Sequence, residues 1–231
     1  MQSAPLHRRA GSSVVEQLAF NQLVVGSNPT PRTCWGFLYT MRIISGVAGG
    51  LKLEVPKAVT RPTTDKVRQA IFSMLGDAVP DAVVLDLFAG SGAMGLECLS
   101  RGAASATFVD ESRASAVVIK TNLDKTRLAN GTVRQGDALR FLAEAARAPS
   151  FDLVFADPPY VKERGAKNWC QALLDSPDLD AAVKPGGLLV LESAASTQLT
   201  WDDNRWTLLR ERSYGDTRVW CWSKKDAHAD A

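Results

Sequence analysis

The chain has 231 residues, of which 45% are hydrophobic, and a formal net charge of only +2 at pH 7, so it can bury one good core without an overall basic surplus. Its two histidines, His7 and His228, lie in the terminal segments, and its four cysteines are scattered without a C-x-x-C pair. This distribution argues against a buried His-based triad, a metal site and a disulfide framework. No apolar run reaches the about 18 to 20 residues of a membrane span, and no signal-peptide pattern is present, so we expect a cytoplasmic protein.

Residues 1–40 differ from the rest of the chain. The stretch from Gly11 to Pro29 resembles the conceptual translation of a transfer-RNA gene, which is a source of spurious reading frames. We therefore expect Met41 to be the natural start and residues 1–40 to be a spurious or disordered leader. A targeting peptide with Arg8 and Arg9 as its charged region is the alternative, but acidic and amide residues interrupt its apolar stretch.

Residues 41–75 are expected to form a small N-terminal module. The pattern from Arg42 to Val55 predicts two short strands around Gly49 and Gly50. A helix is predicted to begin after a threonine or aspartate cap and to run to about Leu75.

This module carries the only local charge imbalance that we find. Six basic residues face only two acidic ones between residues 41 and 75, a surplus of four. We expect Arg61, Lys66 and Arg68 to contact nucleic-acid phosphates. Two alternatives remain open, namely an ordinary solvated helix face, and a helix start that binds the carboxylate of a cofactor.

From Ala82 onwards, short apolar runs alternate with helical ones, which predicts the strand–helix units of a parallel, doubly wound sheet. A turn is predicted at 185–187, and the runs 206–212 and 218–223 are typical of an antiparallel hairpin that closes one sheet edge. We expect one α/β catalytic domain over 76–224 and a disordered tail over 225–231. Strands are predicted at 82–88, 106–110, 132–135, 151–156 and 188–192, and helices at 92–100, 113–125, 139–146 and 168–174.

The first chemical motif follows the strand that ends at Phe88. Gly90 and Gly92 let the backbone approach a ligand, and the helix start beyond them offers N–H groups and a positive dipole end. The spacing also matches a dinucleotide fingerprint, with Asp110 about 20 positions on. However, Asp86 inside the first strand would repel a pyrophosphate, which favours S-adenosylmethionine over a nicotinamide cofactor.

The second motif is Asp157-Pro158-Pro159-Tyr160, directly after an apolar strand. A carboxylate, a prolyl carbonyl and an aromatic ring at one strand end can hold an exocyclic amino group and stack on its base. Hydride transfer does not need this arrangement, whereas methylation of an amino nitrogen does. A strand that simply stops at proline is the alternative explanation.

These motifs assign a role to each candidate residue. The methionine end of the cofactor is expected over Asp86 and the turn of Gly90 and Gly92, its ribose hydroxyls at Asp110, and its adenine at Asp137 beside the N–H of Ala138. Asp137 could also be an ordinary surface turn residue. Asp157, the carbonyl of Pro158 and the ring of Tyr160 are the expected catalytic group.

Four segments together resemble one family. The segment at 61–68, the glycine motif at 85–97, Ser100-Arg101-Gly102-Ala103 and Asp157-Pro158-Pro159-Tyr160 are similar to the bacterial small-subunit rRNA guanine-N2 methyltransferases of D type, over 41–224. The resemblance implies a class I fold, S-adenosylmethionine as donor, and a 16S rRNA guanine N2, the family target being guanine 966, as acceptor. It also implies rRNA or an assembling small subunit as the partner, and we expect a monomer.

Three other functions share part of the pattern. A DNA amino-methyltransferase would need a target-recognition region, for which the roughly 30 residues after Tyr160 leave little room. A protein glutamine methyltransferase usually begins the motif with asparagine and has no reason for a basic module. A non-catalytic RNA-binding assembly factor would tolerate loss of Asp157, yet the full motif is present.

Overall fold

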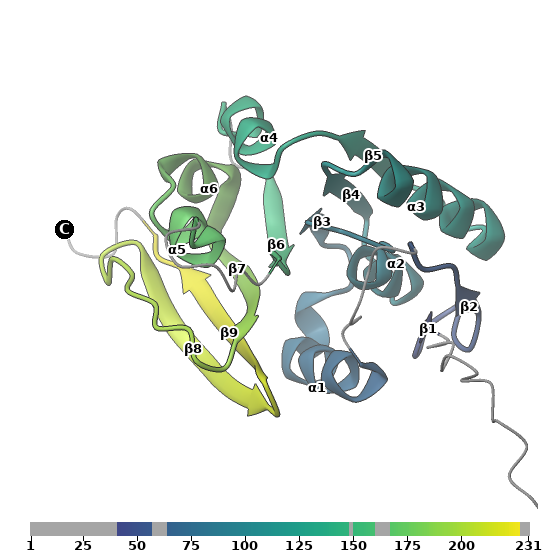
Figure 1. Cartoon of the computed structure of the whole chain (residues 1–231), viewed down its shortest axis with the longest axis horizontal. Helices are drawn as coiled ribbons and strands as arrows, with labels where there is room; N and C mark the ends of the chain where they lie inside the picture. Colours follow the sequence, from purple (N-terminus) through teal and green to yellow (C-terminus); the bar gives the residue numbers. More distant parts are fainter. Residues whose placement is uncertain (1–40, 57–63, 148–149, 160–166, 227–231) are drawn as a thin grey trace, which may run out of the picture. The chain divides into compact units, whose positions relative to one another are not determined.

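The computed structural model describes residues 41–56, 64–147, 150–159 and 167–226. The chain divides into two compact units, 1–38 and 39–231, and the first lies outside the described residues. The second unit contains all the helices and strands discussed below (Figure 1). In chain order they are β1 (Met41–Arg42), β2 (Lys52–Leu53), α1 (Asp65–Leu75), the 3-10 turn η1 (Gly76–Ala78), β3 (Val83–Leu87), α2 (Ala93–Ser100), β4 (Ser105–Asp110), α3 (Arg113–Thr126), β5 (Gly131–Gln135), α4 (Ala138–Ala145), β6 (Phe151–Ala156), α5 (Trp169–Leu174), α6 (Pro177–Ala182), β7 (Val183–Ala194), β8 (Trp206–Tyr214) and β9 (Thr217–Lys224).

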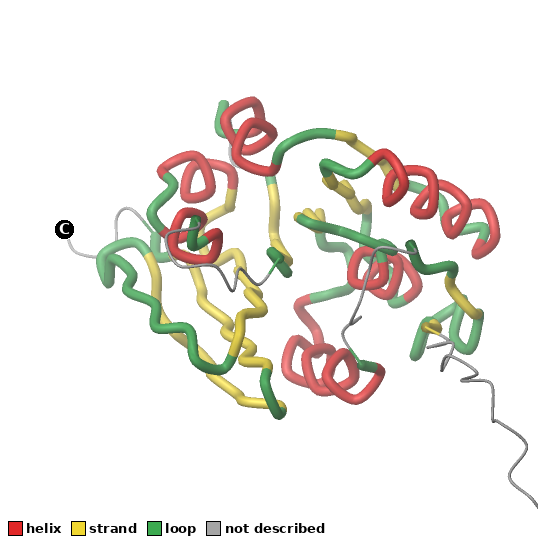
Figure 2. Tube along the Cα trace, in the orientation of Figure 1, coloured by secondary structure: helices red, strands yellow, loops and turns green. Residues whose placement is uncertain are grey.

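A seven-stranded sheet in the order β5-β4-β3-β6-β7-β9-β8 forms the centre of the unit (Figure 2). The strands from β5 to β7 are parallel, and β9 and β8 add to β7 as an antiparallel hairpin. The expected doubly wound sheet with a C-terminal hairpin is therefore confirmed. The chain runs outward from β3 to β5 and then returns to β6 on the other side of β3. Ligands of such sheets bind at this reversal, beyond the carboxyl ends of the strands.

Helices cover both faces of the sheet, with α1, α2 and α3 on one face and α4, α5 and α6 on the other (Figure 1). Because side chains alternate along a strand, neighbouring residues of β3 enter different cores. Val84 packs with the helices of the first face and Leu85 with those of the second, and both are fully buried. Near-continuous apolar runs such as 151–156 are typical of strands buried on both faces.

The β1–β2 hairpin is bound to helix α2 through buried polar groups. The carboxylate of Glu97, which is fully buried, accepts hydrogen bonds from the backbone N–H groups of Ile44 at 2.6 Å and Ser45 at 3.0 Å. Gly46 has φ +83°, and a Cβ there would lie 1.9 Å from the carbonyl oxygen of Ser100. Residues of 41–75 thus share one core with the rest of the second unit.

Two differences from the predicted secondary structure affect the sheet and its helices. Helix α6 was not expected, although Ser176 caps it by accepting from the N–H of Leu179, and Pro177 occupies its first turn. The turn predicted at 185–187 is wrong, because these residues lie within β7. Gly186 has φ +72°, and the β6–β7 register shifts beside it. The Pro-Gly-Gly sequence therefore produces a bulge inside a strand.

Candidate active site

Strand register brings the two sequence motifs to one edge of the sheet. Leu87 of β3 pairs with Ala156 of β6 on one side and with Val109 of β4 on the other. Asp110 pairs with Gln135 of β5. The loops that follow β6, β3, β4 and β5 are therefore neighbours at the carboxyl edge. These loops contain Gly90, Gly92, Asp137, Asp157 and Pro158, beside the strand residues Asp86 and Asp110 and the first residue of α4, Ala138.

Asp110 connects three of the four loops. Its Oδ2 accepts a hydrogen bond from the N–H of Gly90 and its Oδ1 accepts one from the N–H of Ser112, both at 2.8 Å. Its main-chain carbonyl accepts from the N–H of Gly136 at 3.0 Å. Each carboxylate oxygen keeps a second lone pair, so Asp110 can still accept hydrogen bonds from ligand hydroxyls.

The glycine loop needs its glycines for backbone shape and for packing. Gly90 and Gly92 have φ +54° and +77°, a left-handed conformation that other residues rarely adopt. Gly95, in the first turn of α2, packs so closely that a Cβ would lie 2.3 Å from the ring of Phe108 on β4. The helix start is thus held against the sheet, with its N-terminus at the carboxyl edge.

Asp86 lies beneath this loop and is 3% exposed. Its Oδ2 accepts from the N–H of Gly95 at 2.9 Å. Burial raises the pKa of Asp86 to about 7; the bond from Gly95 opposes this rise and the negative charge of Asp110 adds to it. A carboxyl group with this pKa ionises readily when a cation is placed beside it.

Asp137 and Ala138 lie where α4 begins. Asp137 is the N-cap of α4, and its Oδ1 accepts from the N–H of Arg140 at 2.9 Å. The half-buried carboxylate has a second oxygen beyond this capping bond, and Ala138 is buried beside it. The proposed contact of Asp137 with an adenine is compatible with this placement and stays a prediction.

Asp157 and Pro158 follow β6 directly, beside the glycine loop. Asp157 is exposed and Pro158 is buried. Burial and then the nearby charge of Asp157 raise the pKa of the Cys170 thiol to about 12, which places the carboxylate near α5. Tyr160 lies outside the described residues, so its stacking role stays a prediction.

An aromatic pair that sequence reasoning missed borders this edge. Phe88, the first residue after β3, has φ +56°, which is unusual for a bulky side chain. Its ring meets that of Trp169 edge to face, with the centroids 5.6 Å apart, and the ammonium of Lys167 lies 3.9 Å from the centre of the Trp169 ring. The positive φ of Phe88 could not be predicted from the sequence, because glycine, asparagine and aspartate are the residues that signal this conformation.

Asn122 of α3 is a second residue that sequence reasoning missed. Its side chain is fully buried and joins the glycine loop to Glu54, the residue after strand β2. Its Nδ2 donates to the carbonyls of Ser91 at 2.9 Å and Glu54 at 3.0 Å, and its Oδ1 accepts from the N–H of Glu54 at 2.8 Å. This buried amide therefore uses both of its N–H groups and one oxygen lone pair, and these bonds position the loop.

The three basic residues predicted to contact RNA have different surroundings. Arg61 lies outside the described residues, and Lys66 is exposed on the first turn of α1. The side chain of Arg68 is fully buried, 2.7 Å from the carboxylate of Asp65 and 2.6 Å from the carbonyl of Arg42. This burial is at odds with a phosphate contact by Arg68 and indicates that it ties α1 to β1.

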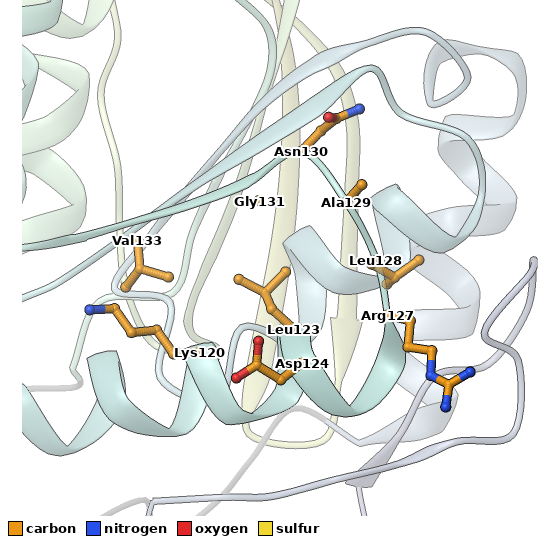
Figure 3. Close-up of a pocket in the computed structure, with 9 residues that line it drawn as sticks. All are labelled: Lys120, Leu123, Asp124, Arg127, Leu128, Ala129, Asn130, Gly131 and Val133. Carbon is orange, nitrogen blue, oxygen red and sulfur yellow. The ribbon is translucent and has the colours of Figure 1, made fainter.

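One hollow in the described part of the chain is remote from these motifs. It has a volume of about 640 Å³ and lies between the end of α3 and the start of β5, at the amino edge of the sheet. Lys120 and Arg127 point away from one another there, with Asp124 between them (Figure 3). Among the described residues, no group of three or more potential ligand side chains could hold a metal ion, and no helix could span a bilayer.

Comparison with known proteins agrees with the fold and the motifs. The model of a family described as Conserved hypothetical protein 95 matches residues 41–223. The ribosomal RNA small subunit methyltransferase D of Escherichia coli K12 is 38% identical over 176 residues, which is 76% of this chain and 85% of the relative. The solved structure of yhhF from Escherichia coli, 35% identical, superposes with a TM-score of 0.69 over 80% of this chain and 98% of that one.

A more distant structure shows the fold alone. An RNA methyltransferase of Salinibacter ruber, solved with S-adenosyl-L-homocysteine, is 18% identical and has a TM-score of 0.54 over 74% of this chain and 98% of that chain. Its fold is the class I, Rossmann-like methyltransferase fold that the strand order of the present sheet also has. The protein therefore belongs to the Conserved hypothetical protein 95 family, together with the ribosomal RNA small subunit methyltransferases D.

Proposed function

We propose that this protein transfers a methyl group from S-adenosylmethionine to the exocyclic N2 of a guanine in 16S rRNA, the family target being guanine 966. The pairing of Leu87 with Ala156 carries the proposal, because it sets Asp157-Pro158 directly beside the glycine loop. An amino group held at the first motif would then meet a methyl donor held at the second. The relative from Escherichia coli, which is a ribosomal RNA methyltransferase by name, supports rRNA as the substrate.

The loops at the carboxyl edge fit S-adenosylmethionine. The glycine loop offers close backbone approach and a helix start, and Asp86 provides an acid for the cationic methionine end. Asp110 retains acceptor capacity for the ribose hydroxyls, and Asp137 for the adenine amino group. When bound, this cofactor supplies an electrophilic methyl group and a neutral thioether as the leaving group.

Asp157 and Pro158 would orient and activate the guanine. The carboxylate of Asp157 and the carbonyl of Pro158 accept the two amino hydrogens, which turns the nitrogen lone pair toward the donor. Because N2 becomes cationic as it attacks, a fixed carboxylate stabilises the transition state more than the ground state. The extra proton then leaves to water, and no strong base is needed.

The surroundings of β3 and α1 suggest how the RNA is held. A guanine brought out of its helix can stack on Tyr160, and the pair of Phe88 and Trp169 borders the same edge. Lys66 is exposed at the start of α1 and is available for a phosphate, as is Lys167 beside Trp169. Arg61 keeps its proposed phosphate contact.

A transfer assay combined with nucleotide mapping tests the proposal. The protein would be incubated with radiolabelled S-adenosylmethionine and either 16S rRNA or small subunits from a strain that lacks the corresponding gene. We expect label in the rRNA. Mass mapping of nuclease fragments should show that one guanine has been converted to N2-methylguanine.

Label in DNA or in a protein glutamine, with none in rRNA, would replace the proposal by one of the two other methyltransferase activities. Binding of rRNA without any transfer under conditions where S-adenosylmethionine binds would favour a non-catalytic assembly factor. Label on another atom of the guanine, or on another base, would keep rRNA methylation and reject the N2 assignment.

A further inference from the structure

A cleft between α1 and the β8–β9 hairpin has a distinctive lining. It has a volume of about 290 Å³ and is separate from the carboxyl-edge motifs. Helix α1 contributes Ala70, Ser73 and Met74, and β8 contributes Arg210, Arg212 and Tyr214. Figure 1 shows α1 lying beside the hairpin on one side of the sheet.

Strand register explains why both arginines face this cleft. Arg210 pairs with Cys221 and Arg212 with Val219, and these two partners belong to the core that α1 covers. A register shift between Leu208 and Arg210 sets this alternation. Because paired residues project to the same face, the arginines point to the α1 side of the sheet.

The charge of the cleft is uncompensated among the described residues. No carboxylate lines it, and no ion pair between described residues includes either arginine. The intervening Glu211 pairs with Arg218 at 3.1 Å, on the strand positions that alternate with the cleft. Both arginines are exposed, and within the described part of the chain their side chains donate to carbonyls of their own strand, at Leu209 and Glu211.

The cleft leads toward the active edge of the sheet. Tyr214 pairs with Thr217, and Thr217 with Ala194, three residues beyond the Leu191 that pairs with Ala156. The Tyr214 end of the cleft therefore lies at the same sheet end as Asp157. Lys66 precedes Ala70 by four residues and Ser73 by seven, so it shares their helix face and adds a further cation to it.

We propose that this cleft binds the phosphate backbone of the RNA strand next to the target nucleotide. The proposal rests on the proposed function and adds a second contact surface to it. Two guanidinium groups and a phenol offer the donors that phosphate oxygens accept, and the small side chains of Ala70 and Ser73 leave room for the backbone. The hollow between α3 and β5 lacks this character, because Asp124 lies between its two cations.

The salt dependence of RNA binding tests this proposal. The variant would be Arg210→Gln/Arg212→Gln, and the matched control Lys120→Gln/Arg127→Gln, which removes the same charge from the other hollow. The binding constant for a 16S rRNA transcript would be measured over a series of KCl concentrations. The cleft variant should lower the slope of log K against log salt by about 1.4 to 1.8, at about 0.7 to 0.9 for each phosphate contact, whereas the control should keep the wild-type slope.

Three further measurements make the result decisive. Arg210→Lys/Arg212→Lys should restore most of the slope, since phosphate attracts any cation, and S-adenosylmethionine affinity should be unaltered in every variant. Equal slopes for the wild-type protein and the cleft variant, with methyl transfer to rRNA still measurable, would overturn the cleft and leave the function standing. An equal decrease of the slope in the cleft variant and in the control would also overturn it, because such a result would indicate a nonspecific effect of charge. Absence of transfer to rRNA by the wild-type protein would remove the function, and the cleft with it.

Discussion

The ends of β3 and β6 are adjacent strand ends that each provide a carboxylate, yet the two regions differ in almost every other respect. Asp86 is buried beneath a loop whose backbone is bonded to Asp110 and Asn122. Asp157 is exposed, beside Pro158. The β3 end is therefore organised before any ligand arrives, whereas the acidic residue at the β6 end is exposed.

This difference is consistent with the two proposed partners. A small cofactor gains affinity from a preorganised site, because little ordering has to accompany binding. A nucleotide within a large RNA has to approach its acceptors from solvent, so they need an open side. The buried acid should therefore control cofactor affinity, and the exposed acid should control the rate of transfer.

Replacing Asp157 should have the largest effect. Asp157→Ala is expected to lower the transfer rate by a factor of ~10² to 10³, since the group that stabilises the developing positive charge is lost, while cofactor affinity falls far less. Single-turnover kinetics and calorimetry would measure the two quantities. Asp157→Asn is the matched variant, because its amide oxygen can still accept an amino hydrogen but cannot neutralise the cationic nitrogen. Wild-type turnover in both variants would make Asp157 a turn residue only.

Replacing Asp110 should weaken the binding of the cofactor. Asp110→Ala removes the acceptor for Gly90 and Ser112 as well as the expected ribose contact. S-adenosylmethionine binding should weaken by ~1.5 to 3 kcal/mol, the usual loss for hydrogen bonds to a charged group. Asp110→Asn keeps one oxygen for the loop and should lose less. Tight NAD binding by the wild-type protein, without measurable S-adenosylmethionine binding, would contradict the cofactor assignment.

The pH dependence of cofactor binding should reveal Asp86. With a pKa of about 7 in the free protein, only a minor fraction of this carboxyl is ionised at pH 6 and most of it at pH 8. If the cationic methionine end prefers the ionised form, affinity should rise by about tenfold between these values, with proton release on binding. Asp86→Asn should flatten this profile in calorimetry at several pH values. An equally steep profile in the variant would assign the titration to another group.

A rise in pH should affect the free energy of unfolding through Asp86 in the opposite direction to cofactor affinity. The raised pKa means that between the ordinary 3.8 and about 7 the folded protein keeps a proton that the unfolded chain has lost. Stability of the free wild-type protein should therefore fall as the pH rises through this window. In Asp86→Asn that contribution should be absent from denaturant unfolding curves.

The smallest effect is expected from removing residues 1–40. Neither strand end should depend on them, and the family model begins its match at residue 41. Methyl transfer, cofactor affinity and the thermal midpoint should be the same in the shortened and full-length chains. Insolubility or loss of transfer on truncation would show that the leader contributes to the fold.

The sequence predicted the strand ends well, because their signals are local. The apolar runs before Asp86 and Asp157, and the glycines after Phe88, indicate where a chain leaves a buried sheet. The same locality explains the error at 185–187, since Pro-Gly-Gly occurs both in turns and in strand bulges, and the local sequence does not distinguish the two.

The supports of the site could not be predicted in this way. Asn122 reaches Glu54 over 68 residues, and Arg68 reaches Arg42 over 26. On a helix, each looks like an ordinary polar surface residue until its distant partner is known. Only the packing of α1, the hairpin and the glycine loop against one another decides that these side chains are buried.

The Asn122 bridge also bears on how the molecule opens. Because one side chain bonds both Glu54 and Ser91, the residue after β2 and the glycine loop share one support on α3, and separation of β2 would expose that support to water. We therefore expect local unfolding of the β1–β2 hairpin to be coupled to loosening of the glycine loop. Bound cofactor should then protect the backbone of the β1–β2 hairpin from proteases, although none of the residues proposed to contact the cofactor lies in that hairpin.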